Sequence, residues 1–437
     1  MVSQNKPTRI FALLILSALL GLSMMLESCT DSCTDSYSYT YYKPVYTQLS
    51  DIRSSVGILP PQPLSTIGKI YFKDGFLFIN DPGEGIHVID NSDPSNPLKK
   101  SFINIPGNFD LAIRNNILYA DSYIDLVAID ISDINHVVEV SRLKNIFASY
   151  NSLGFYADEA RGVVTEWVES EEVTIDEHAC ENKVEWWGGF YYREGIMAQN
   201  DVGFSSKALI NPGNSTGVGG SMARFTINSD HLYMLDGGNI HTADISIPSK
   251  PESKSSQYLG WDIETIFPYS NKLFIGTRNG MHILDLSIPE TPEKIATYEH
   301  VTSCDPVVVD GDYAYVTLRS GTECQGFTNQ LEVIDVSTIT IPSLLKTYSM
   351  VNPHGLGVDE ATLFICDGEA GLKIYNIEDK QNIDKNLIKH YSNIHAYDAI
   401  PFNDVLMLIG EDGIFQYDYS NISAITKLSQ IKVQGEN

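Results

Sequence analysis

One short strand pattern recurs eight times along this chain of 437 residues and limits what it can fold into. Each copy ends in an acidic or amide residue, which we call the anchor, and the clearest copies are residues 86–90, 281–285 and 331–335. The eight anchors are Asp90, Asp130, Asp176, Asp244, Asp285, Asp335, Asn376 and Asp418. They are 40, 46, 68, 41, 50, 41 and 42 residues apart, so the repeat is about 41 residues long, with insertions in the third, fourth and sixth copies.

Each repeat also has a fixed pattern before and after its anchor. Residues 305–316 and 68–78 both read as strand, tight turn and strand, and turn pairs such as Asp74-Gly75 supply the positive φ that a two-residue hairpin needs. Six anchors have a Ser two positions later, where the anchor side chain can hydrogen-bond the next turn. A Pro that follows stops the strand. The pattern predicts four strands per repeat and no comparably long helix.

These repeats predict an all-β fold, a β-propeller of about 41-residue, four-stranded blades. One blade cannot bury both faces of its sheet, so blades must stack, and closing them into a ring leaves few exposed edges. Eight anchors favour eight blades. Seven is the alternative, because the third repeat is degenerate and has His178 where Ser is expected.

The strands at residues 86–90 and 331–335 resemble the LVIVD-repeat family of bacterial surface propellers. The resemblance covers roughly residues 65 to 433, and the departures are Asn376 at one anchor, the weak third repeat and a long insertion. It implies a β-propeller, often on a lipoprotein, and leaves the biochemical activity open.

The amino terminus predicts export. Lys6 and Arg9 precede an apolar run over residues 10–22, which is too short to span a membrane and suits a signal peptide. Cys29 stands where a lipoprotein signal places its lipid-modified cysteine, although Glu27 departs from the usual small residue. We therefore expect a signal at 1–28, a tether at 29–64 and a propeller at 65–437 with an insertion at about 177–221. The alternative is an ordinary cleaved signal followed by a disordered segment.

The net charge of −27 limits the partners. Such a surface repels nucleic acid and anionic lipid, so contact with the membrane is expected through the lipid anchor only. A cell-envelope protein or a glycan remains as partner, and the outer membrane or cell surface of a bacterium is the expected location.

Two cysteines are expected to pair. Cys304 precedes the first strand of the sixth repeat and Cys324 lies in an expanded loop between its second and third strands, so both fall on one rim of the propeller. Export permits a disulfide there. Free buried thiols are the alternative.

The insertion is the least repetitive stretch and contains Trp186, Trp187, Tyr191 and Tyr192. Exposed aromatic rings can stack on sugars or anchor a protein partner. The competing interpretation is that these rings pack the insertion onto the blade beneath.

Aligning the repeats at the start of their first strands gives a second candidate site. Asp305 corresponds to Asp110, Glu264, His354 and Asp398, and Arg224 lies one place along from an equivalent position. First strands line the axis of a propeller, so these side chains would form an acidic funnel able to hold a divalent cation or a hydroxyl-rich ligand. The alternative is a polar channel that holds ordered water.

The sequence thus predicts a surface-anchored binding or scaffolding module without an identified cofactor, and catalysis is the less favoured interpretation. The runner-up is an exported glycan hydrolase or lyase that uses funnel carboxylates as acid and base. An opposed carboxylate pair about 5 to 10 Å apart in a closed pocket would distinguish it.

Overall fold

A computed structural model describes residues 35–39, 42–148, 150–152, 154–169, 173–177, 219–221, 223–261, 263–300, 306–321 and 328–433. The chain divides into two compact units, residues 1–45 with 167–196, and residues 46–166 with 197–437. In the first unit, β1 (Asp35–Tyr39) pairs antiparallel with β15 (Val173–Glu177). β2 (Tyr42–Thr47) and β14 (Val163–Glu169) each run across the boundary between the units.

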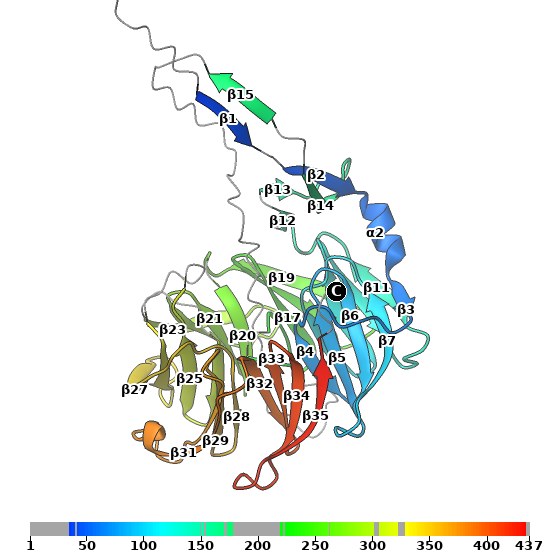
Figure 1. Cartoon of the computed structure of the whole chain (residues 1–437). Helices are drawn as coiled ribbons and strands as arrows, with labels where there is room; N and C mark the ends of the chain where they lie inside the picture. The colour runs from blue at the N-terminus through cyan, green and yellow to red at the C-terminus, as the bar shows by residue number, and fades with distance from the viewer. Residues whose placement is uncertain are drawn as a thin grey trace, which may run out of the picture. The chain divides into compact units, whose positions relative to one another are not determined.

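The second unit contains seven antiparallel sheets of four strands each, which we call blades I to VII (Figure 1). Blade I comprises β4 (Ile70–Lys73), β5 (Phe76–Asp81), β6 (Gly85–Asp90) and β7 (Leu98–Asn104), with β3 (Gly57–Leu59) added as a fifth, outer strand. Blade II comprises β8 (Leu111–Arg114), β9 (Ile117–Ser122), β10 (Asp125–Asp130) and β11 (Val138–Leu143). Blade III comprises β16 (Phe225–Asn228), β17 (His231–Asp236), β18 (Asn239–Asp244) and β19 (Glu252–Tyr258). Between blades II and III, β12 (Asn151–Ser152) pairs with β13 (Phe155–Tyr156).

The remaining four blades repeat this plan. Blade IV comprises β20 (Ile263–Tyr269), β21 (Lys272–Thr277), β22 (Gly280–Asp285) and β23 (Glu293–Glu299), and blade V comprises β24 (Val307–Asp310), β25 (Tyr313–Leu318), β26 (Gln330–Asp335) and β27 (Ser343–Ser349). Blade VI comprises β28 (Leu356–Asp359), β29 (Thr362–Cys366), β30 (Leu372–Asn376) and β31 (Leu387–Tyr391), with the short 3-10 helix η2 (Ile383–Lys385). Blade VII comprises β32 (Ala396–Phe402), β33 (Val405–Gly410), β34 (Gly413–Asp418) and β35 (Thr426–Lys432).

The all-β propeller is confirmed, and the blade number is seven, which was the alternative to the preferred eight. The third anchor, Asp176, lies in β15 opposite Ser36 of β1 and not in a four-stranded blade. All seven blades begin with a hairpin whose first turn residue has a left-handed φ of +47° to +57°. These residues are Asp74, Asn115, Ser229, Ser270, Gly311, Glu360 and Asn403. A strand ending in Asp is therefore not enough to specify a blade, because the hairpin in front of it is also needed.

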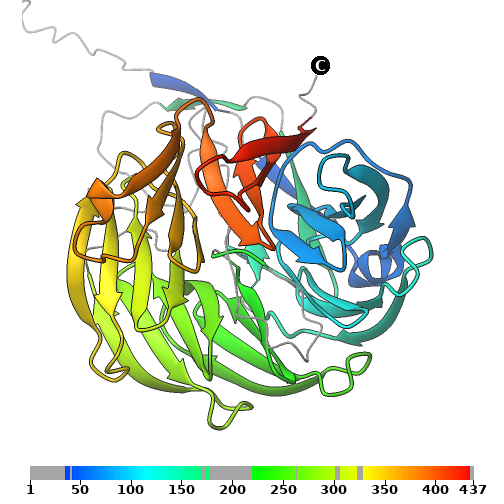
Figure 2. The same cartoon turned by 90° about the horizontal axis from the view of Figure 1, so that it is seen from below.

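The blades close into a ring (Figure 2). Apolar side chains between neighbouring sheets form the core, and one buried cluster joins Ile70 and Ile79 of blade I to Ile400, Met407 and Ile414 of blade VII. Sheet-on-sheet packing of this kind buries both faces of every blade, so no sheet has to face water with an apolar side.

The packed unit begins at Tyr46, ahead of the boundary expected at residue 65. Residues of the expected tether form helix α2 (Leu49–Ser55), and β3 pairs with β7 at the outer edge of blade I. Leu49 and Ile52 of α2 are buried against Ile124 and Val163. α2 and the other described helical segment are both too short and too polar to span a membrane.

Alternating strand directions give the ring two ends. At one end, the entry face, first and third strands begin, and chain segments pass from one blade to the next. At the other end, the anchor face, the anchor side chains stand at the ends of third strands. There Asp285 Oδ1 accepts hydrogen bonds from the Ser287 N–H and hydroxyl, both at 2.7 Å. Asp90 and Asp335 bind Ser92 and Ser337 in the same way, as the sequence pattern predicted.

Candidate functional site

The strand register places seven residues at one equivalent position, one per blade, on the entry face beside the axis. Each lies five residues before the left-handed turn residue of its blade. In blade order they are Lys69, Asp110, Arg224, Thr265, Pro306, Gly355 and Asp398. We call this set the inner ring. Asp110, Arg224 and Asp398 of the predicted funnel are members, whereas Glu264 and His354 each lie one residue earlier. Asp305, which precedes Pro306, is outside the described residues.

Four neighbouring members of the inner ring alternate between acidic and basic side chains, so two basic residues stand among the acids of the expected funnel. They are Asp398, Lys69, Asp110 and Arg224, from blades VII, I, II and III. Burial lowers the pKa of Lys69 to about 8, against the opposing attraction of the Asp110 and Asp398 carboxylates. The sequence alignment used Gly68 and Ala223, and Lys69 and Arg224 are the residues that follow them. Counting five residues back from each left-handed turn residue would have identified Lys69 as a member of the set.

The two inner-ring carboxylates are held differently. Asp110 Oδ2 accepts hydrogen bonds from the backbone N–H groups of Arg224 and Phe225, so it joins blade II to blade III. Asp398 is fully buried, and neither of its carboxylate oxygens has a hydrogen-bond partner of normal geometry. Burial raises the pKa of both groups, that of Asp398 well above its usual value.

A short segment of chain occupies the centre of the ring. A Cβ added at Gly219 would lie 3.0 Å from the Tyr71 ring of blade I, and the Ser221 hydroxyl accepts a 3.5 Å hydrogen bond from the Leu356 N–H of blade VI. Ala223 then accepts from the Ile266 N–H of blade IV at 2.8 Å. Only a segment near the axis can reach blades I, VI and IV in so few residues. Gly219 and Gly220 end the glycine-rich stretch of the sequence, and a side chain at Gly219 would require the Tyr71 ring to shift.

The other predicted funnel residues make local contacts. Glu264 Oε1 accepts a 2.8 Å hydrogen bond from Arg278 Nε. His354 is buried, with its Nε2 3.3 Å from the Asn352 amide and its ring edge-on to Tyr397. Among the described residues, the structure therefore places Asp110, Arg224 and Asp398 in the inner ring, whereas Glu264 and His354 contact side chains beside it.

Several predicted residues lie outside the described residues. They are the lipidation site Cys29, the proposed disulfide partners Cys304 and Cys324, and the insertion aromatics Trp186, Trp187, Tyr191 and Tyr192. The described residues contain one free cysteine, the buried Cys366. Burial raises the pKa of its thiol well above the usual value, which makes it an inert packing residue.

A cavity of about 470 Å³ opens between the loop that leaves blade II and the outer strands of blade III. One wall is the end of β11 and the residues that follow it, namely Leu143, Lys144, Asn145, Ile146 and Ala148. The opposite wall is Asp236, Asn239, His241, Ser253 and Ser256. We call this cavity the blade II–III pocket.

The loop wall of this pocket is fixed by a buried carboxylate. Asp125 Oδ1 accepts a 3.0 Å hydrogen bond from the Asn145 N–H. The same carboxylate binds Arg53 Nε of α2 at 2.7 Å and Arg142 at 3.1 Å. Because Asp125 is buried and paired with two arginines, its geometry is held from both sides.

His241 lines the pocket and is 6% exposed. Its Nε2 is 3.7 Å from Asp236 Oδ2, and neither ring nitrogen has a hydrogen-bond partner. Its ring lies edge-on to Phe147, which positions it. A buried polar group without a hydrogen bond is costly, so a ligand or water that hydrogen-bonds this imidazole is favoured. His241 shares its place three residues before an anchor with His87 and His282, and only the fold shows that a pocket lies beside one of them.

An exposed aromatic pair stands next to the pocket. Trp261 is 91% exposed and lies edge-on to Tyr258, with ring centroids 5.7 Å apart. Tyr258 is the cross-strand partner of Asn239, which lines the pocket. A Cβ at Gly238 would lie 2.4 Å from the Gly260 carbonyl oxygen and 2.6 Å from the Tyr258 ring, so glycine is needed at this position. The sequence analysis considered only the aromatic residues of the insertion. It did not identify Tyr258 and Trp261, because they lie in an ordinary repeat whose pattern gives no sign that they are exposed.

Comparison with known proteins agrees with this architecture. Residues 68–104 and 303–350 match the family model of the LVIVD repeat, which confirms the resemblance seen in the sequence. No curated protein matches the sequence significantly. A functionally unknown protein from Desulfotomaculum acetoxidans has a similar structure, with TM-score 0.50 and 10% identity over 83% of this chain and 98% of that one. BamB from Moraxella catarrhalis gives TM-score 0.47 and 10% identity over 82% of both chains, and Sqt1 from Saccharomyces cerevisiae gives 0.47 and 8% over 87% and 90%. At 10% identity the likeness to the Desulfotomaculum acetoxidans protein concerns the fold alone.

Proposed function

We propose that this LVIVD-repeat β-propeller is a binding or scaffolding module of the bacterial cell envelope that takes its ligand on the entry face. The observation that carries the proposal is the blade II–III pocket, with the buried His241, whose ring nitrogens have no hydrogen bond, in its wall and the exposed Tyr258 and Trp261 at its side. Loops on a rigid scaffold are a common place for recognition, and this loop is held by Asp125.

The chemistry of the pocket suits a hydroxyl-rich ligand such as an envelope glycan. The Lys144 ammonium and the amides of Asn145 and Asn239 can donate hydrogen bonds, while Ser253 and Ser256 can donate or accept. Trp261 offers a planar apolar face on which a sugar ring can stack. The net charge of −27 disfavours polyanionic ligands over most of the surface.

The described carboxylates of the entry face favour binding over hydrolysis. Asp110 and Asp121 accept backbone N–H bonds, and Asp367 accepts from the N–H groups of Val351 and Asn352. Such carboxylates position loops between blades, whereas a glycosidase needs a pair about 5 to 10 Å apart that faces the substrate. A glycan hydrolase is therefore the weaker alternative.

A lipid on Cys29 would hold the propeller at the envelope. The sequence motif supports this part of the proposal, together with a basic and apolar amino terminus. Metabolic labelling with a fatty acid should mark the full chain and fail to mark the Cys29→Ala variant, which should leave the membrane fraction. Label retained in the variant would contradict lipidation at this residue.

Ligand binding is tested with the full chain in detergent on an array of envelope glycans. Trp261→Ala should weaken binding of the best glycan about tenfold, the loss of roughly 1.4 kcal/mol of aromatic contact. His241→Ala should also weaken it, whereas Ile288→Ala, which removes an exposed side chain of the anchor face, should not. Equal binding by all three variants and the unmodified chain would refute an entry-face site.

A further inference from the structure

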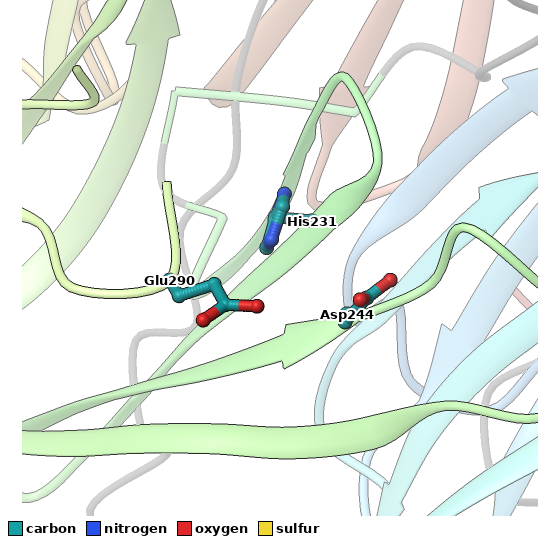
Figure 3. Close-up of side chains that lie close together, drawn as sticks. All are labelled: His231, Asp244 and Glu290. Atoms are coloured by element: carbon teal, nitrogen blue, oxygen red, sulfur yellow. The ribbon is translucent and has the colours of Figure 1, made fainter. Parts of the chain in front are cut away.

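Three potential metal ligands from two blades meet on the anchor face (Figure 3). His231 begins β17, Asp244 is the anchor of blade III, and Glu290 lies in the blade IV loop between β22 and β23. One ligand atom from each lies within 4.8 Å of the others. We propose that these three side chains bind a divalent transition metal ion such as Zn²⁺, which links blade III to blade IV.

The loop that carries Glu290 is already fastened to blade III. The Tyr233 hydroxyl donates a 2.9 Å hydrogen bond to the Pro289 carbonyl, and the Ser255 hydroxyl donates a 2.5 Å bond to the Glu290 carbonyl. The backbone of the loop is thus fixed on both sides of the Glu290 side chain. Metal sites bind more tightly when their ligands are held in place beforehand.

The two side chains from blade III offer one ligand atom each. Asp244 uses Oδ1 to accept a 2.8 Å bond from the Ser246 N–H, as the anchors generally do, and its Oδ2 has the Lys254 ammonium 3.5 Å away. The Nε2 atom of His231 is buried and has no hydrogen-bond partner. An imidazole with two carboxylates is a ligand set that zinc accepts, with water in the remaining position.

An ammonium group competes for the same carboxylates. Lys254 Nζ is 3.5 Å from Asp244 Oδ2 and 3.4 Å from Glu290 Oε1. This charge holds the carboxylates together and must move aside when a metal ion binds. Lys254 Nζ is already paired with Glu252 Oε2 at 3.4 Å, so the ammonium keeps one carboxylate partner when it moves away from Asp244 and Glu290.

The other blade junctions provide an internal comparison. In blade III, His231 lies directly opposite the anchor Asp244 across the strand pair. The residues at the same position in the other six blades are Phe76, Ile117, Lys272, Tyr313, Thr362 and Val405. None of these is a histidine, so the arrangement is not a consequence of the repeat. The sequence analysis placed a possible divalent cation in the central channel. Among the described residues, the group of side chains that could hold one lies instead at the junction of blades III and IV.

The test measures zinc binding by isothermal titration calorimetry with the full, untagged chain in detergent. His231→Ala and Glu290→Gln should each bind one fewer zinc ion per chain, or bind that ion at least about tenfold more weakly. Lys254→Met should bind the same ion at least about tenfold more tightly, a gain that misfolding cannot produce. His282→Ala, which removes a half-buried histidine from the third strand of blade IV, serves as the matched control and should bind as the unmodified chain does.

Two results would overturn the proposal. One is unchanged zinc stoichiometry and affinity in both His231→Ala and Glu290→Gln. The other is a site that binds Ca²⁺ or Mg²⁺ as tightly as Zn²⁺, because these ions select oxygen ligands and would leave the imidazole without a role. Far-ultraviolet circular dichroism of each variant confirms that the propeller is folded before binding is compared.

Discussion

Asn91 and Gln416, which are 325 residues apart, exchange two hydrogen bonds between their side-chain amides, at 2.8 and 2.7 Å. Asn91 follows the anchor of blade I, and Gln416 lies in the third strand of blade VII. Both are buried, and the Gln416 amide also reaches the Pro94 carbonyl at 3.2 Å. This pair is part of the contact that closes the ring between the two ends of the repeat array.

Gln416→Leu should therefore destabilise the propeller. It leaves the buried Asn91 amide without its partner, which costs about 1 to 3 kcal/mol of unfolding free energy. Urea denaturation of the full chain measures the difference. Gln381→Leu, which changes an exposed glutamine of blade VI, is the control, and an equal effect of both substitutions would show that the closing pair adds nothing.

Asp121 should make stability fall as the pH rises. Burial raises its pKa to about 6, so between about pH 4 and 6 the folded chain binds more protons here than the unfolded chain does. Asp121→Asn removes this charge but keeps the Oδ1 atom that accepts from Asn108, Phe109 and Asp110. The stability of the variant relative to the unmodified chain should rise between pH 4 and 7, by at most about 3 kcal/mol. Denaturation at both pH values measures it, and a difference that does not change with pH would contradict the assignment.

The anchor turns can be tested by titration. The hydroxyl and N–H of Ser92 lower the pKa of Asp90 to about 2, and Lys100 assists. Ser92→Ala should raise the pKa of Asp90 towards its ordinary value, because the hydroxyl donor is lost. NMR of the Asp90 carboxyl carbon follows the titration. Ser95→Ala, which removes a hydroxyl bound to Asp93, should leave Asp90 unchanged.

Gly371 should be intolerant of substitution. Its φ is +88°, and a Cβ there would lie 1.9 Å from the Tyr391 carbonyl oxygen of the neighbouring strand. Gly371→Ala should cost about 2 kcal/mol or more, because backbone must move. Gly311 has a φ of +57° with no atom within 4 Å of the added Cβ, so Gly311→Asn should be nearly neutral. Thermal unfolding of both variants compares the two glycines.

Much of the fold could be predicted because the repeat is local. The hairpin turns, the anchors with their serines and the alternation of strands all depend on neighbours a few residues away, and these parts agree with the structure. The site was harder, because side chains from different blades meet through register. Glu264 and His354 lie one residue before the inner-ring position of their blades. That difference of one residue is enough for them to contact Arg278 and Tyr397 and not to join the inner ring.

The sequence by itself determined the all-β repeat, the four strands of each blade and the turn chemistry between them, because these follow from backbone conformations that individual residues prefer. Only the tertiary structure decided that seven blades close the ring, that residues 219–221 fill its centre and that His231, Asp244 and Glu290 meet. Ring closure is a packing condition on all blades at once, and residues far apart in sequence come together only when it is satisfied.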